Sequence, residues 1–306
     1  RADESLPIFL RKAGLVKNLN FRVGHAAVCL INPQTFEVIY YDFGRYISPR
    51  GYGRARSKYT DPELVLQTKA VLNEDKDLMN VEEIAAELER KAKYTHGIGP
   101  LVFSVSKSID YIKAKKYTDE MVMKGYFPYN GLLKSASNCA RYVTETIKAA
   151  SEDGTVGTKL KYPLTLRPTP LFNVVAAKTQ DTIYSFEGGT LQFLEKSRRH
   201  SITDLSAGLL ETAFTKYTES RPDDSIHGDI AEPERPSSLP ATAQWLGGLG
   251  EGAWFDISEV DGHTFKGKKF DKTGQLEHEA LYSNNEVEVP SNPKITYASH
   301  YGFFSI

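Results

Sequence analysis

Two strand-like runs joined by a short turn constrain the fold more than any other part of the sequence. The runs FRVGHAAVCLI (21–31) and FEVIYYDFG (36–44) are rich in β-branched and aromatic residues, and the segment NPQT (32–35) separates them. Proline in such a segment presets φ, and asparagine can bond the backbone ahead of it. The chain is therefore expected to form an antiparallel hairpin here.

The expected hairpin places two polar side chains, His25 and Asp42, opposite each other. This pairing follows when Asn32 and Thr35 close the turn. Opposed residues of an antiparallel pair share a face, with Cβ atoms roughly 5 Å apart. A carboxylate in that position can bond one imidazole nitrogen, fix the tautomer and stabilise the protonated ring. The inference depends on the register, because a slip of one residue would put the two side chains on opposite faces.

Helix signals follow further along the chain. Residues 80–97 predict the clearest helix, with Asn80 as its cap, acidic residues in its first turn and Gly97 at its end. Residues 61–72 predict another helix, with proline in the first turn. The segment 173–186 predicts a second hairpin.

A third helix is predicted to begin at a cysteine, in the stretch YNGLLKSASNCARYVTETIKAA (129–150). Ser137 or Asn138 is a suitable cap, and four apolar residues share one helical face: Ala140, Val143, Ile147 and Ala150. Unpaired amides and the helix dipole at this end favour a thiolate on Cys139, and the same amides can receive an oxyanion. Cys139 is thus a candidate nucleophile, the alternative being a small buried side chain. Cys29, in mid-strand, is expected to be core.

Composition divides the remainder of the chain. Residues 220–243 are rich in Pro, Ser, Asp and Glu and predict a linker or exposed loop. Residues 244–306 contain short β-like runs separated by glycine turns, ending in a strand-like segment at 294–306. We therefore expect a domain over 1–219, the linker, and a small β-rich C-terminal domain over 244–306.

The stretches GHAAVCLI, VIYYDFG and NCARYV together resemble circularly permuted papain-like enzymes, namely the permuted NlpC/P60 cysteine peptidases and the lecithin:retinol acyltransferase group. In the permuted enzymes, the strand that carries the histidine comes first, a strand with a polar residue comes second, and the helix that begins at the cysteine comes third. The resemblance implies that Cys139 is the nucleophile, His25 the base and Asp42 the residue that orients His25. It also implies an α+β fold, permuted papain-like, with an antiparallel sheet and a helical insertion before Cys139.

The sequence departs from the acyltransferase group in two places. That group carries a second histidine where this chain has Asp42, and a different pair of residues where this chain has Ala140 and Arg141. Its similarity to the family ends before the C-terminal third of the chain.

The loop GRYISPRGYGRARS (44–57) follows Asp42 and is a candidate substrate-binding segment. Its arginines, Arg45, Arg50, Arg54 and also Arg56, are expected to contact a phosphate or carboxylate of a substrate, with Tyr46 and Tyr52 available for stacking. The alternative is that these arginines are solvated or paired locally.

Other classes of function are disfavoured. A net charge of −1 provides no field that would recruit nucleic acid, and no apolar run reaches the roughly 18 residues of a membrane-spanning helix. The histidines lack paired ligand spacing, so neither a metal nor a cofactor is expected, and GGLGEG (247–252) lacks the context of a phosphate loop. Two cysteines favour a reducing compartment, hence the cytoplasm, although the sequence begins with Arg1 and a removed signal peptide is the alternative.

The sequence thus predicts a cysteine-nucleophile hydrolase (amidase or peptidase) or acyltransferase that acts on a small-molecule or peptide substrate with an acyl bond. A non-catalytic binding module that retains a papain-like cleft is the alternative, and a structural protein with a coincidental motif is a third. The sequence specifies neither an oligomeric state nor the substrate.

Overall fold

The structure is a computed structural model, and it describes most of the chain. The described residues are 24–97, 99–130, 135–152, 154–161, 168–178, 182–195, 200, 231–248, 251–283, 290 and 293–306. The first part of the strand-like run at 21–31 and the first part of the predicted linker, 220–230, lie outside them.

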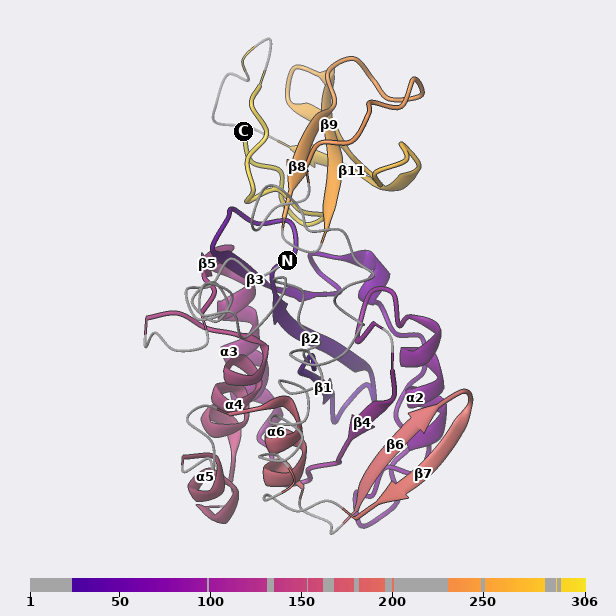
Figure 1. Ribbon diagram of the computed structural model, residues 1–306, viewed down its shortest axis with the longest axis vertical. Coiled ribbons are helices and arrows are strands. Elements are labelled where there is room, and N and C mark those ends of the chain that lie inside the picture. Colours follow the sequence, from indigo (N-terminus) through magenta and orange to yellow (C-terminus); the bar gives the residue numbers. More distant parts are fainter. Residues whose placement is uncertain are drawn as a thin grey trace, which may run out of the picture.

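An antiparallel sheet forms the centre of the N-terminal part (Figure 1). Its strands, in spatial order, are β1 (Ala27–Ile31), β2 (Val38–Gly44), β3 (Tyr52–Ser57) and β5 (Tyr126–Pro128). Strands β1 and β2 pair antiparallel, so the hairpin predicted from the sequence is confirmed. Strands β3 and β5 both come from the segment that was expected to be a helical insertion, and they extend the sheet instead of lying outside it.

The register of this hairpin differs by two residues from the predicted one. Asp42 pairs with Ala27 rather than His25. The turn is longer than expected because Phe36 adopts a left-handed backbone (φ 59) and Asn32 bonds with Glu37 across the loop. Phenylalanine rarely takes this conformation, so the sequence gives little sign of it. A shift of two residues keeps the side-chain parity, and His25 therefore stays on the same face as Asp42.

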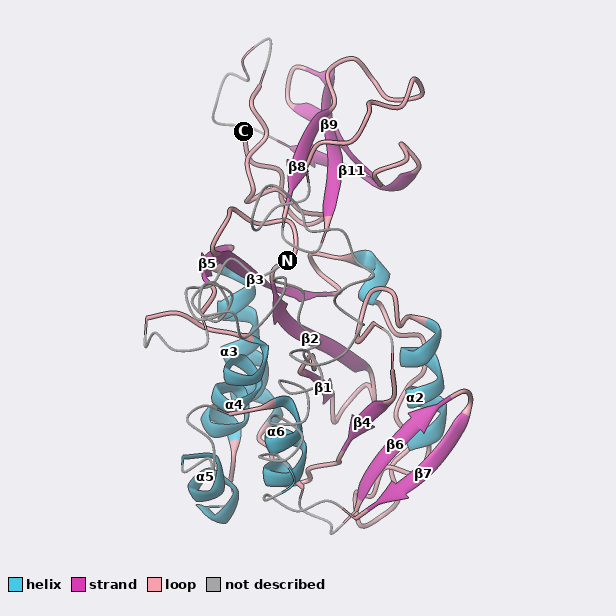
Figure 2. Ribbon diagram, in the orientation of Figure 1, coloured by secondary structure: helices cyan, strands magenta, loops and turns pink. Residues whose placement is uncertain are grey.

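Helices cover both faces of this sheet (Figure 2). On one side lie α3 (Tyr111–Met123), α4 (Cys139–Ala150), α5 (Gly154–Lys161) and α6 (Pro170–Ala177). On the other side lie α2 (Val81–Arg90) and a short 3-10 turn, η1 (Pro62–Leu64). The helix predicted at the cysteine is confirmed with its first residue at Cys139, and the helix predicted at 80–97 is confirmed over α2.

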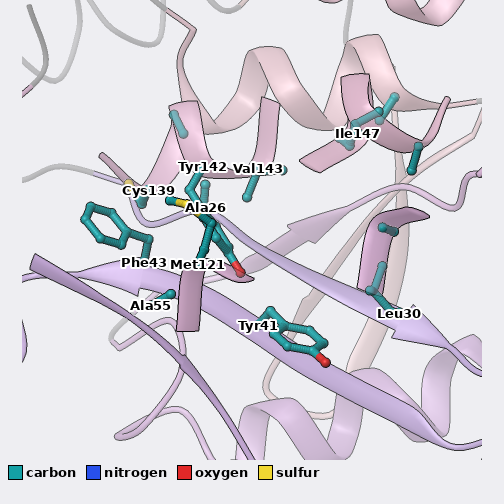
Figure 3. Close-up of a cluster of buried hydrophobic side chains, with 14 of the residues drawn as sticks. Ala26, Leu30, Tyr41, Phe43, Ala55, Met121, Cys139, Tyr142, Val143 and Ile147 are labelled. Atoms are coloured by element: carbon teal, nitrogen blue, oxygen red, sulfur yellow. The ribbon is translucent and has the colours of Figure 1, made fainter. Parts of the chain in front are cut away.

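Alternation along β1 and β2 separates two hydrophobic cores, as expected for a sheet buried on both faces. Odd-numbered β2 residues such as Tyr41 and Phe43 join α3 and α4, whereas Val38 and Tyr40 join α2. Figure 3 shows the first core, with Cys139 at one end of the cluster near Phe43 and Ala26. The four residues predicted for the apolar face of the cysteine helix are all buried in this core.

Two further antiparallel sheets complete the structure. The smaller one contains β4 (Leu101–Phe103), β6 (Ile183–Glu187) and β7 (Thr190–Leu194). The C-terminal sheet contains β8 (Gln244–Gly247), β9 (Gly252–Asp261), β10 (Thr264–Phe270) and β11 (Leu276–Ser283), and it lies at the top of Figure 1. The molecule is therefore an α+β protein with antiparallel sheets. The division into domains at residues 219 and 244 stays a prediction.

Three expectations about local structure were wrong. Residues 61–72 form only the single turn η1, because Val65 bridges to Ile39 of the sheet and the Glu87 carboxylate binds the amides of residues 67 and 68. The segment 173–186 begins as helix α6, and the hairpin lies later, between β6 and β7. At 294–306 there is a single isolated bridge between His300 and Phe303, not a strand.

Candidate active site

Cys139 opens helix α4 at the edge of the central sheet. The Asn138 side chain caps the helix by accepting a hydrogen bond from the backbone amide of Arg141 (2.8 Å). The thiol itself is buried and receives a hydrogen bond from the backbone amide of Ala26. Asn173 of α6 braces this first turn, since its amide donates to the Ala140 carbonyl (2.7 Å). The thiol is thus held against β1 by local and tertiary contacts.

His25 lies two residues before β1 begins, and its ring connects the other two predicted residues. Its Nε2 lies 3.0 Å from Oδ2 of Asp42. A second hydrogen bond joins the imidazole to the thiol of Cys139. Since Nε2 faces Asp42, Nδ1 is the ring nitrogen left for the thiol.

The Asp42 carboxylate is fully buried and is held by four side chains, including His25. Arg56 of β3 donates to both of its oxygens, from Nε at 3.1 Å and from Nη2 at 2.8 Å. The hydroxyls of Tyr40 and Tyr46 also donate to Oδ2. Few orientations of the carboxylate are compatible with all these bonds, so its position relative to His25 is fixed.

The electrostatics of the three residues are strongly coupled. Burial would lower the pKa of His25, but the hydrogen bonds to Asp42 and Cys139 outweigh it and raise the pKa to about 10. Burial would raise the pKa of the Cys139 thiol, but the hydrogen bond and charge of His25 outweigh it and lower the pKa. Burial would likewise raise the pKa of Asp42, yet Arg56 and His25 lower it. All three directions favour the charged forms: a thiolate, an imidazolium and a carboxylate.

Cys29, by contrast, is partly buried and packs against the hydrophobic core that faces α2. Burial raises the pKa of its thiol to about 12. It lies in mid-strand among the hydrophobic residues that pack against α2. This environment matches the expectation from the sequence, and it makes Cys29 an internal reference for the reactivity of Cys139.

Tyr129 is a site neighbour that the sequence analysis did not identify. Its side chain hydrogen-bonds the thiol of Cys139, and its ring stacks on Phe43 with centroids 5.6 Å apart. The guanidinium of Arg45 lies 4.4 Å from the centroid of the same ring. The position of Tyr129 at the start of the stretch that leads to Cys139 was the available signal, but only the fold places Tyr129 beside Ser137 and the thiol.

Two arginines of the loop 44–57, Arg54 and Arg56, form ion pairs with nearby carboxylates. Arg54 is buried and forms a two-pronged ion pair with Asp61 (2.6 and 2.7 Å), and substrate binding by Arg54 stays a prediction. Arg56 is committed to Asp42 and to the Tyr94 carbonyl (2.7 Å). The alternative of local pairing therefore holds for both. Burial in the sheet required a partner for each charge, and the loop composition does not reveal those partners.

The other loop residues lie in different environments. Tyr46 contacts Asp42 and His25 directly through its hydroxyl, and its role in substrate binding stays a prediction. Arg50 is exposed, and Tyr52 packs edge-on against Tyr126. Substrate binding by Arg45 and Arg50 stays a prediction.

The described part of the chain contains neither a candidate metal site nor a candidate membrane-spanning helix. No group of three or more His, Cys, Asp or Glu residues there could hold a metal ion. None of the helices described is long and apolar enough to cross a membrane.

Comparison with known proteins identifies the family. A family model described as "Type VI secretion system effector TseH-like" matches residues 1–156, which include all three residues of the site. A second family model, the DUF6695 C-terminal domain, matches residues 243–306. No curated protein and no solved structure matches the chain. Since the first match covers half of its 306 residues, the chain belongs to the TseH-like family of type VI secretion system effectors.

Proposed function

We propose that the protein is a cysteine hydrolase that cleaves an amide bond, with Cys139 as nucleophile, His25 as acid and base, and Asp42 as the residue that orients His25. The observation that carries the proposal is the continuous hydrogen-bonded chain from Cys139 through His25 to Asp42. A nucleophile, a base and an orienter within hydrogen-bond reach are the arrangement that covalent acyl transfer requires.

The first half-reaction forms a thioester. The Cys139 thiolate attacks the carbonyl carbon, and the resulting oxyanion lies near the amides at the start of α4. The backbone amide of Cys139 is the main-chain donor for this oxyanion, and the Tyr129 hydroxyl beside the thiol is a side-chain donor. Collapse of the tetrahedral intermediate breaks the carbon–nitrogen bond, and His25 gives its proton to the leaving amine.

The second half-reaction releases the acyl group. His25, now neutral, takes a proton from a water molecule as that water attacks the thioester carbonyl. The carbon–sulfur bond then breaks, a carboxylic acid leaves, and the thiolate and imidazolium are restored. Water needs no binding site of its own, so we propose hydrolysis instead of transfer to another acceptor. The substrate class is a peptide or small molecule with an amide bond.

We further infer that the fold is papain-like in permuted order. Along the chain, His25 precedes strand β1, Asp42 lies on β2, and Cys139 begins a helix that packs on the same sheet. Membership of a family of type VI secretion effectors is consistent with a papain-like cysteine hydrolase. It also leads us to propose that the protein acts after export, in place of the cytoplasmic location expected from its cysteines.

Trapping of the acyl-enzyme tests this function. The protein is incubated with a mixed library of amides, thioesters and activated esters, and adducts are measured by intact mass and peptide mapping. We expect an adduct on Cys139 in the wild type and in the matched Cys29→Ala variant, and none in Cys139→Ala. Amide hydrolysis that survives in Cys139→Ala, or the absence of any adduct on Cys139, would contradict the proposal. The second result would favour the non-catalytic binding module.

A further inference from the structure

A short loop, Arg45–Ser48, contacts both the candidate site and the C-terminal sheet. Ile47 is buried in a hydrophobic cluster made by residues of the C-terminal part of the chain: Leu246, Ala253, Phe255 and Ile295. Gly248, at the end of β8, lies directly on the backbone of Tyr46, because a Cβ added there would be 1.8 Å from the Tyr46 carbonyl oxygen. The C-terminal sheet therefore determines where this loop lies.

The side chain of Tyr46 points from this loop into the site. Its hydroxyl donates to Oδ2 of Asp42 and lies 3.3 Å from Nε2 of His25. The Arg56 guanidinium lies 3.3 Å from the centroid of the Tyr46 ring, on the ring face. Burial and the nearby Asp42 carboxylate keep the pKa of Tyr46 well above its usual value, so the hydroxyl keeps its proton and acts as a donor.

From these contacts we propose that the C-terminal sheet completes the site, with Tyr46 as a positioning residue and with Ile47 and Gly248 as the contacts that hold Tyr46 in place. This inference rests on the proposed function, since it concerns the same Asp42–His25 pair. It assigns a role to the region matched by the DUF6695 model, which the family match leaves without one.

The physical argument concerns the Asp42–His25 hydrogen bond. Tyr46 shares oxygen Oδ2 with the imidazole and closes a triangle with Oδ2 and Nε2. Its bulky ring also shields this hydrogen bond, which would be weaker if water could compete for Oδ2. If the loop moves, Tyr46 withdraws, and the imidazole loses part of the constraint that directs Nδ1 toward the Cys139 thiol. The thiolate is then less favoured.

Glycine-to-alanine substitution in the C-terminal sheet tests the proposal without altering any residue of the site. Gly248→Ala inserts a methyl group against the Tyr46 carbonyl. Gly262→Ala, in the turn between β9 and β10, is the matched control because nothing lies within 4 Å of its added Cβ. The measurement is the second-order rate of Cys139 alkylation by iodoacetamide as a function of pH, read by peptide mass, with Cys29 as the internal reference.

We expect Tyr46→Phe and Gly248→Ala each to slow Cys139 alkylation at neutral pH by about tenfold, which is the size of effect expected from losing one hydrogen bond to a charged group. Both variants should also reach their half-maximal alkylation rate at a higher pH than the wild type. Gly262→Ala should match the wild type. In the double variant Tyr46→Phe/Gly248→Ala the two effects should not add, because Gly248 acts through the Tyr46 side chain.

The outcomes are distinguishable. If the wild-type Cys139 has the pH profile of an ordinary thiol, the proposed function fails. If the wild type is activated but Gly248→Ala behaves like Gly262→Ala, or its effect persists in the Tyr46→Phe background, this inference fails and the proposed function stands. Should Gly248→Ala not fold, Ile47→Ala provides the same test, with Leu160→Ala of α5 as an equally buried control. Unchanged alkylation in a folded Ile47→Ala variant would overturn the inference.

Discussion

Asp42 shows how a single buried carboxylate can orient a base without competing for its proton. Burial would raise its pKa, but the ion pair with Arg56 and the hydrogen bond from His25 hold the pKa below its usual range. An acid this strong does not take the proton from His25, so its role is to fix the ring and to stabilise the imidazolium. Arg56 is therefore part of the structural support of the site, although the sequence suggested a substrate contact.

Replacing Arg56 with methionine should cost about 3–5 kcal/mol of unfolding free energy, because the buried Asp42 charge would lose its ionic partner. Arg50→Met is the matched control, since Arg50 is exposed and its removal should change stability by less than about 0.5 kcal/mol. Urea denaturation of both variants at neutral pH measures the difference. Equal stability of the two variants would mean that the Arg56–Asp42 pair is not the constraint described above.

At the scale of elements, helix α4 was well predicted because its signals are local. Asn138 precedes the helix with the correct side chain for a cap, and the apolar residues that follow repeat at helical spacing. The hairpin was predicted for the same reason, yet its register depended on a left-handed Phe36, which no local rule anticipates.

Elements and contacts that depend on distant partners were predicted poorly. Residues 61–72 have helical composition, but pairing of Val65 with Ile39 and binding of two backbone amides by Glu87 extend them. The partners of Arg54 and Arg56 are set by strand pairing between β2 and β3 and by a turn after β3. Tyr129 reaches Cys139 because Tyr129 and Ser137, two residues before the thiol, form a parallel bridge.

Removal of the α4 cap should affect both stability and reactivity. Asn138→Ala is expected to cost about 1 kcal/mol of unfolding free energy and also to slow Cys139 alkylation, because the amides near the thiol lose their fixed arrangement. Thr169→Ala removes the equivalent cap of α6, where the hydroxyl accepts from the Phe172 amide (3.1 Å), and serves as the control. We expect a similar loss of stability in both variants and slower alkylation only in Asn138→Ala. Equal alkylation rates in the two variants would show that the Asn138 cap does not contribute to activation of the Cys139 thiol.

At the scale of the whole molecule, a buried lysine links the C-terminal sheet to the N-terminal part. Lys269 of β10 is 4% exposed and lies 2.9 Å from Glu277, 3.5 Å from Glu251 and 3.7 Å from Glu63 of η1. Burial would lower its pKa, but these carboxylates outweigh burial and raise it, so the side chain stays charged. Together with Ile47, this cluster couples the two parts of the chain.

Lys269→Met should destabilise the protein by about 3–5 kcal/mol, because three carboxylates would lose their shared cation. Lys266→Met is the control on the same strand, since Lys266 is only partly buried and lies 3.9 Å from Glu279. Chemical denaturation monitored by fluorescence should show a lower midpoint only for Lys269→Met. A Lys269→Met midpoint equal to that of the control would show that the charge cluster does not couple the two parts.

The measurement that tests the central claim most directly is the pH dependence of Cys139 alkylation in the wild type and in His25→Ala. The account predicts a wild-type rate that is half-maximal below pH 9.0, the ordinary pKa of the thiol, because His25 stays charged up to about pH 10. In His25→Ala, the two largest causes that lower the thiol pKa are lost and only the hydrogen bonds from the Ala26 amide and Tyr129 oppose burial, so the half-maximal rate should move to higher pH, toward the behaviour of Cys29. Identical profiles in the two proteins would contradict the thiolate–imidazolium pair and, with it, the proposed cysteine hydrolase.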